Sequence, residues 1–186
     1  MKKLFTILAV SSSLIYAQSG WSVYGGWNSN GMTAEGLDAS YTNSKSFNVG
    51  ISKQLGEKVT IGTGLHHRGG YINTNVAEKV EGHVFELWST WSLLSMENGA
   101  SLWAGPSIAF KADLDYKLGG PDKTGDVKME DTDLSLLLGA SFPLSERNTI
   151  HLVFQQSLRD VNLSYGNSDW YTVEFDQIYL NFSRSL

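Results

Sequence analysis

Histidine, a side chain that can bind a metal ion or move a proton, occurs twice in succession in the cluster His66-His67-Arg68. A metal site needs two or more ligands that converge on one ion. Successive residues of a strand point to opposite faces, so we expect His66 and Arg68 to point inward and His67 outward. The histidines are then unable to share an ion, and we assign no metal ligand and no cofactor.

Glu86 lies between Phe85 and Leu87, in the middle of an apolar run. A carboxylate that faces lipid is costly, so Glu86 is predicted to face the interior, where a buried charge needs a partner. The candidate partners are Arg68, Lys111 and His66. We interpret the group as an interior salt bridge that fills space, and a gate-like ion pair is the alternative.

Acidic residues gather around the segment 114–132, and oxygen ligands in a loop could hold Ca²⁺. No EF-hand spacing is present, so we expect a solvated acidic loop, with divalent cation binding left open. The acids are Asp113, Asp115, Asp122, Asp126, Glu130, Asp131 and Asp133.

The sequence contains no nucleophile elbow, no HExxH motif and no phosphate-binding loop. We therefore assign no catalytic residue and predict a protein that is not an enzyme. A lipid-modifying acyl hydrolase or acyltransferase is the alternative. It would require His66 or His83 near a serine and a carboxylate at the outer rim.

The elements that position these residues are predicted from an alternation of period two. Apolar residues at Leu134, Leu136 and Leu138 alternate with Ser135 and Gly139, although Leu137 breaks the pattern. Three short joints, near 56–57, 97–99 and 145–148, alternate with four long polar stretches. This predicts eight antiparallel strands in an up-and-down barrel, over residues 20–28, 45–54, 58–69, 83–93, 100–113, 133–142, 149–158 and 171–182.

The apolar face is predicted to contact lipid, while small and polar side chains fill a narrow lumen. Inward glycines are expected at positions 50, 62, 64, 105 and 139. Aromatic residues near strand ends resemble two interfacial girdles. They are Trp21, Trp91 and Phe142 at one end, and Trp27, Phe47, Phe85, Phe110, Trp170 and Tyr171 at the other. The alternative is a soluble exported lipocalin-like barrel, which would turn its apolar face inward.

Residues 1–17 are predicted to be a cleaved signal peptide, with Lys2 and Lys3 before the apolar stretch 4–10. Residues 18–186 would form the barrel domain. Without Lys2 and Lys3 the net charge goes from −5 to −7, which argues against nucleic acid as a partner. The chain has no cysteine, which excludes thiol catalysis and disulfides.

Short motifs add a family resemblance, carried by Val49-Gly50-Ile51, Leu55-Gly56-Glu57-Lys58, Ala104-Gly105-Pro106-Ser107 and 138–144. Together they resemble the outer membrane protein beta-barrel family of small, OmpA/OmpX-like, porin-family proteins. The alternating Ile178, Leu180 and Phe182 before Leu186 resemble that family's assembly signal. The resemblance implies a monomer without an open pore, with outer-membrane lipid, lipopolysaccharide and the barrel-assembly machinery as partners. It carries over no catalytic residue.

Two places depart from a regular barrel. Pro106 lies in mid-strand, where a bulge or a local distortion is expected. In the last strand the apolar phase changes from Val173 and Phe175 to Ile178 and Leu180. Either a bulge near 176–177 or a membrane boundary below Phe175 would account for the change.

The predicted function is an integral outer-membrane barrel without a wide pore, which contributes to envelope integrity or binds an external partner through its loops. Aromatic side chains dominate interface hot spots. The candidate loop contacts are therefore Tyr41, Tyr71, Tyr116, Tyr165 and Trp170.

Overall fold

The computed structural model describes residues 20–34, 44–73, 78–110, 113–118 and 123–186. The predicted signal peptide, Tyr41 and Lys111 lie outside these ranges. The described residues form eleven strands, and among them no helix is long and apolar enough to span a bilayer. The strands are β1 (Trp21–Ala34), β2 (Ser44–Leu55), β3 (Val59–Asn73), β4 (Glu78–Ser95), β5 (Ser101–Ala109), β6 (Asp113–Lys117), β7 (Lys123–Met129), β8 (Asp133–Pro143), β9 (Asn148–Ser157), β10 (Val161–Tyr165) and β11 (Ser168–Ser185).

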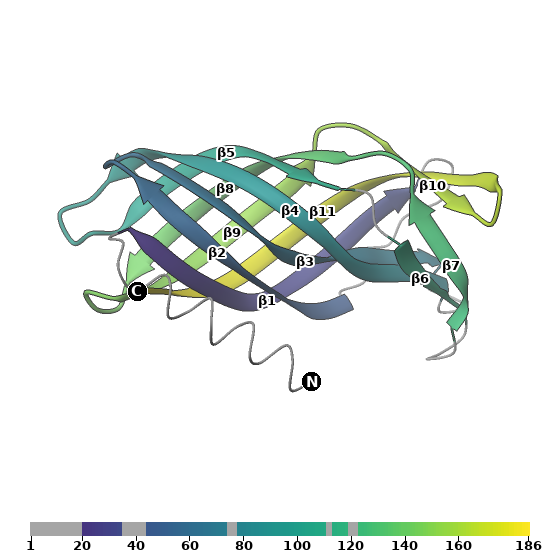
Figure 1. The fold of residues 1–186 in the computed structure, drawn as a ribbon, viewed down its shortest axis with the longest axis horizontal. Coiled ribbons are helices and arrows are strands. Elements are labelled where there is room, and N and C mark those ends of the chain that lie inside the picture. The colour runs from purple at the N-terminus through teal and green to yellow at the C-terminus, as the bar shows by residue number, and fades with distance from the viewer. Residues whose placement is uncertain (1–19, 35–43, 74–77, 111–112, 119–122) are drawn as a thin grey trace.

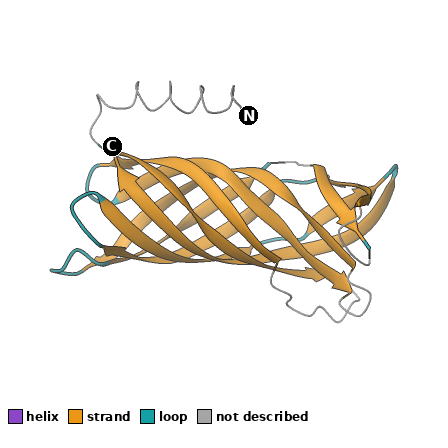
Figure 2. Ribbon diagram, turned by 90° about the horizontal axis from the view of Figure 1, so that it is seen from below, coloured by secondary structure: helices purple, strands orange, loops and turns teal. Residues whose placement is uncertain are grey.

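Eight of the described strands close a ring in the order β1-β2-β3-β4-β5-β8-β9-β11, and β11 pairs with β1. All the pairings are antiparallel, and the strands cross the barrel at a tilt (Figure 1). The three short joints lie at one end, which we call the turn end (Figure 2). The chain also finishes there, where the Leu186 N–H donates to the Trp21 carbonyl. The predicted eight-stranded up-and-down barrel with three short turns is confirmed.

The outside of the ring is apolar and the inside is polar. In β8, exposed Leu134, Leu136 and Leu138 alternate with buried positions, among them Ser135 and Leu137. The same alternation exposes Phe154 in β9 and Leu180 in β11. A band of exposed leucine, isoleucine, valine and phenylalanine side chains is the surface that a bilayer requires. The soluble barrel, with its apolar face inside, is therefore wrong for this part of the molecule.

Inward glycines make room for three aromatic side chains in the ring. A Cβ atom at Gly62 would overlap the Trp88 ring, and one at Gly139 would overlap the Trp103 ring. A Cβ atom at Gly50 or Gly64 would collide with the Tyr24 hydroxyl. A narrow eight-stranded lumen is filled by side chains, and here glycines on one strand accommodate large residues on the next.

The remaining strands continue the barrel wall beyond the apolar band. At the end opposite the turns, β6 pairs with the outer part of β4, β7 joins β6 to β10, and β10 pairs with β11. We call residues 78–84, 113–118, 123–130 and 161–176 the cap (Figure 1). The predicted long loops 114–132 and 159–170 are thus largely β-hairpins.

The cap has an apolar core that faces inward. Its fully or almost fully buried members from the cap are Val80, Val84, Leu114, Val127, Met129, Val161, Leu163, Val173 and Phe175, and Met32 of β1 and Ala109 of β5 pack with them. Tyr171, expected in the outer aromatic girdle, packs against this core together with Tyr116. Outside the bilayer the exterior meets water, so apolar side chains turn inward as in a soluble protein.

This reversal explains the phase change in β11. The pairing of β11 with β1 runs without a shift from Ser22↔Ser185 to Ala34↔Val173, so no bulge occurs at 176–177. Val173, Phe175, Gln177 and Tyr179 all face inward. The membrane boundary below Phe175 is the correct alternative.

Pro106 distorts the ladder on one side only. Its pairing with Leu136 of β8 is regular, whereas no pairs join β4 to β5 between Trp88↔Ser107 and Trp91↔Ala104. The bulge itself lies nearer the turn end, between Ser92 and Leu94. Proline cannot donate to the ladder, which accounts for the gap.

Candidate functional site

A buried ionic cluster lies in the middle of the lumen, on strands β3, β4 and β8. The Arg68 Nη2 atom is 2.9 Å from Glu86 Oε2 and 3.2 Å from Asp133 Oδ2, and all three side chains are 0% exposed. One guanidinium therefore joins two carboxylates across the barrel. Removal of charges from water is costly unless they are paired and hydrogen-bonded. The pairing of Arg68 with both carboxylates joins β3 to β4 and β8.

Neutral side chains complete the cluster. Gln155 Nε2 donates to Glu86 Oε1 at 3.0 Å and to Ser107 Oγ at 2.9 Å. The Ser135 and Ser157 hydroxyls donate to the two oxygens of Asp133, at 3.0 and 2.7 Å. The Tyr179 hydroxyl binds the Gln155 and Gln177 side-chain carbonyls. Such a network fixes the cluster in one arrangement.

The sequence candidates Arg68, Glu86 and His66 meet here, while Lys111 lies outside the described residues. His66 Nδ1 is 3.5 Å from Glu86 Oε2, and its Nε2 is 3.0 Å from the Tyr24 hydroxyl. Sequence reasoning missed Asp133 as a partner of Arg68, because it grouped this first residue of the predicted strand 133–142 with the acids of the neighbouring loop. Its position on the same strand phase as Ser135 and Gly139 was the available signal, because those residues were expected to face inward.

His67 was expected to point outward, and its side chain is buried rather than exposed on the outer face of the barrel. It is 6% exposed, its Nδ1 lies 2.8 Å from Asn30 Nδ2, and its ring contacts His83. The pairing of β2 with β3 ends at Val49↔Leu65, and β3 also contacts β1. Gly69, at a φ of 138°, lies in this irregular stretch. The in-and-out alternation of a regular strand therefore does not predict the surroundings of the His67 side chain.

Two layers close the lumen on the cap side. The ionic cluster is the first, and the apolar core of the cap is the second. The two layers are linked directly, since the Phe175 N–H donates to Ser157 Oγ and Ser157 donates to Asp133.

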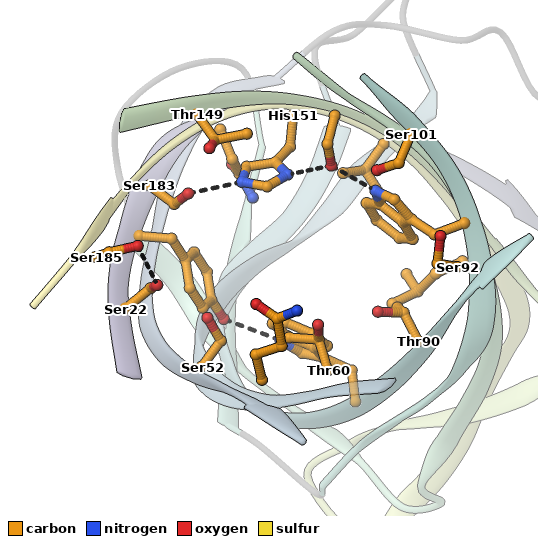
Figure 3. Close-up of a pocket in the computed structure, with 18 of the residues that line it drawn as sticks. Ser22, Ser52, Thr60, Thr90, Ser92, Ser101, Thr149, His151, Ser183 and Ser185 are labelled. Atoms are coloured by element: carbon orange, nitrogen blue, oxygen red, sulfur yellow. Dashed lines mark hydrogen bonds between the residues drawn. The ribbon is translucent and has the colours of Figure 1, made fainter. Parts of the chain in front are cut away.

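The lumen is hollow on the turn side. A cavity of about 390 Å³ extends from Glu57 and Lys58 in the β2–β3 turn to His66, Glu86 and Tyr179. Serine and threonine hydroxyls from the surrounding strands line it, as Figure 3 shows. Trp88, Trp103 and Tyr24 also belong to its wall.

His151 in the cavity wall has serine partners. Its Nδ1 lies 2.7 Å from Ser141 Oγ, and its Nε2 lies 2.7 Å from Ser183 Oγ (Figure 3). Both of these partners, which belong to the described residues, are hydroxyl groups and not carboxylates. Within the described ranges, His66 contacts Tyr24 and Glu86, and His83 contacts the Phe47 and His67 rings. None of these sites has the serine, histidine and carboxylate that the lipid-modifying alternative requires.

The acidic segment does not gather metal ligands in the part of the chain described. No group of three or more His, Cys, Asp or Glu side chains there is arranged to hold a metal ion. Asp122 lies outside the described residues, and Asp133 belongs to the lumen cluster.

The loop candidates that can be placed lie on the cap or next to it. Tyr165 is 41% exposed, and Tyr71 is half-buried with Lys79 Nζ 5.8 Å from its ring. Tyr116 donates to Glu78 Oε1 at 2.7 Å, and burial together with that carboxylate raises the pKa of Tyr116 to about 12. Tyr41 and the Trp170 side chain lie outside the described residues.

Lysines surround a carboxylate on the cap. Glu81 Oε1 lies 2.6 Å from Lys117 Nζ and 3.0 Å from Lys79 Nζ. Partial burial raises the pKa of Glu81, but the hydrogen bonds and charges of Lys117 and Lys79 outweigh it, so the pKa is below its ordinary value. This cross-strand group ties β4 to β6 on the surface of the cap.

No protein-family model and no curated protein sequence matches the chain. Solved structures match the fold of the chain. Neisserial surface protein A is 13% identical over 90% of this chain and 98% of its own, with a TM-score of 0.62. Ail, the attachment invasion locus protein of Yersinia pestis, is 11% identical over 91% and 100%, with a TM-score of 0.55. The outer membrane protein OprG from Pseudomonas aeruginosa is 9% identical over 90% and 96%, with a TM-score of 0.59. By its ring of eight strands and its apolar exterior, the chain has the fold of the small β-barrel proteins of the bacterial outer membrane.

Proposed function

We propose that the protein is a sealed outer-membrane barrel that presents its cap outside the cell, where the cap binds an external partner. The observation that supports this proposal is the Arg68-Glu86-Asp133 cluster in the lumen, together with the buried apolar core above it. A barrel whose lumen is closed in this way does not act as a channel. Its rigid scaffold instead supports an outer surface, which is where such folds place variable binding segments.

The order of the cap supports this proposal. Its strands are joined to the ring by pairing of β6 with β4 and of β10 with β11. Its surface carries aromatic and charged side chains, among them Tyr165, Tyr71 and the Lys79-Glu81-Lys117 group. Aromatic residues on a rigid platform lose little conformational entropy on binding. On this proposal the barrel is a monomer that the barrel-assembly machinery inserts, with lipid and lipopolysaccharide around it.

Surface labelling tests the orientation. The sequence has no cysteine, so single-cysteine variants react with a membrane-impermeant maleimide at one place only. In intact cells Tyr165→Cys should be labelled, whereas Glu57→Cys in the turn should be labelled only after lysis. Both side chains are exposed in the structure. Labelling of the turn but not of the cap in intact cells would refute the proposal.

Conductance tests the seal. The purified protein in a planar bilayer should show no stepwise openings under conditions in which a wide porin conducts. Regular openings by the wild-type protein would mean that a polar path crosses the cap, and the proposed function would fail.

The two possible roles, envelope integrity and binding of an external partner, can be separated in cells. A deletion strain is complemented with a variant in which Tyr71, Tyr165 and Lys79 are alanine. If this variant restores detergent resistance fully but not attachment to surfaces, the cap serves binding. If wild-type protein affects only detergent resistance, envelope integrity is the role and the binding proposal is overturned.

A further inference from the structure

Two tryptophans in the turn-side cavity lie across from glycines. Trp88 of β4 pairs with Gly62 of β3, and Trp103 of β5 pairs with Gly139 of β8. A Cβ atom at either glycine would overlap the indole, so one face of each ring packs on bare backbone. Both tryptophans also line the cavity. Both indoles are partly buried against Leu137, Val153 and Tyr179 and keep part of their surface toward the cavity.

Both indoles are held in place by their N–H groups. Trp88 Nε1 donates to the Tyr24 hydroxyl at 3.1 Å, and Trp103 Nε1 donates to Ser141 Oγ at 2.7 Å. Ser141 is in turn bonded to His151. Flat aromatic surfaces that are already fixed cost little entropy when a ligand stacks on them.

Hydroxyl groups line the cavity wall on several strands around the indoles. They include Ser52, Thr60, Thr90, Ser92, Ser101 and Thr149 (Figure 3). Each hydroxyl can donate one hydrogen bond and accept others. Asn181 adds a buried Oδ1 atom that has no hydrogen-bond partner among the described residues. Such a wall matches a ligand that both donates and accepts at many positions.

Among the described residues that line the cavity, the Glu and Lys side chains lie at its two ends. Glu57 and Lys58 are in the turn at the mouth, and Glu86 at the closed end is paired with Arg68, which also pairs with Asp133. A charged ligand in the middle of the cavity would lose water and gain no opposite charge. The cavity therefore selects for a neutral molecule.

We propose that this cavity is a binding site for a small neutral polyhydroxylated molecule of monosaccharide size, which enters from the turn end. The indole faces of Trp88 and Trp103 stack on its C–H surfaces, and the serine and threonine hydroxyls exchange hydrogen bonds with its own. The volume of about 390 Å³ is within the range of about 300–1,000 Å³ that ligand pockets span. The site goes beyond the proposed role of the cap, since it lies at the other end of the barrel.

The experiment is a titration of the ¹⁵N-labelled protein in detergent micelles with D-glucose, followed by the indole N–H signals. The signals of Trp88 and Trp103 should move saturably. The signals of Trp27 and Trp91 serve as internal controls and should not move, because these side chains are on the outside, 72% and 46% exposed. Gluconate and glucosamine, the anionic and cationic counterparts, should bind at least tenfold more weakly.

Variants locate the site. Thr90→Val keeps the shape of a wall residue but removes its hydroxyl, and should weaken glucose binding about fivefold, the worth of one hydrogen bond. Trp103→Leu should weaken it at least tenfold, while Trp91→Leu should leave it unchanged. Folding of each variant is checked by mobility on an unboiled detergent gel. The proposal is overturned if the Trp88 and Trp103 signals do not saturate with glucose, if gluconate binds as tightly as glucose, or if Thr90→Val binds as the wild type does.

Discussion

Replacement of Arg68 by methionine should destabilise the barrel more than any exposed substitution. The side chain is 0% exposed, and one of its nitrogens lies 2.9 Å from Glu86 and 3.2 Å from Asp133. Methionine fills much of the same space but leaves two carboxylates in the lumen without a cation. Breaking a buried ion pair by removal of one partner costs about 3–5 kcal/mol. Since 1.4 kcal/mol is a factor of ten, the ratio of folded to unfolded protein should fall about a hundredfold to a few thousandfold.

The assay is equilibrium unfolding by urea in lipid vesicles, followed by tryptophan fluorescence. The matched control is Arg159→Met, because Arg159 is exposed and donates its hydrogen bonds to Thr132 of the same region rather than to a buried carboxylate. Its free energy of unfolding should change by about 1 kcal/mol or less. A triple variant with Arg68→Met, Glu86→Gln and Asp133→Asn should recover part of the loss, since no charge is left unpaired. Equal effects of Arg68→Met and Arg159→Met would refute this account of the lumen.

Three other predictions concern the cap and the wall. Phe175→Ala removes a fully buried side chain of the cap core and should lower the free energy of unfolding by about 3–5 kcal/mol. Phe182→Ala is the control: its side chain is 47% exposed, so the loss in the same unfolding assay should be clearly smaller. Gly139→Val would push a side chain into the Trp103 ring and should cost about 1–3 kcal/mol, and an unmoved Trp103 indole signal in NMR spectra would contradict this. The lowered pKa of Glu81 means that its stabilising contribution is complete above its ordinary pKa and is lost as the pH falls through the lowered value. In the Glu81→Gln variant the free energy of unfolding should therefore fall less steeply as the pH is lowered. An unchanged acid dependence would mean that other carboxylates cause it.

The membrane-spanning part of the fold was predictable because lipid imposes a strict rule. Side chains such as Leu134, Leu136 and Leu138 must face acyl chains, so a period of two appears in the sequence. Short turns such as 56–58 interrupt it at one end. The same rule placed Glu86 inside and required a cation near it, which led to Arg68.

The cap was not predictable by that rule, because its outer face meets water. Leu114 and Tyr116 alternate with acids, and Val127 and Met129 alternate with Asp126 and Lys128, so the segment appears polar overall. Its apolar residues turn inward, in the opposite sense to those of the membrane band. Two hairpins were thus interpreted as loops, and Asp133 was counted with the acids outside rather than with Arg68.

The central claim, that apolar side chains face lipid and polar ones fill the lumen, is tested most directly by spin labelling along β8. Single-cysteine variants at each position from 134 to 141, in a chain without native cysteine, are refolded into vesicles, and collision of the attached nitroxide with dissolved oxygen is measured. Labels at 134, 136 and 138 should collide often, and those at 135, 137 and 139 rarely, so that the adjacent leucines 136 and 137 give opposite results. High oxygen collision at the odd positions and low collision at the even ones would contradict the account.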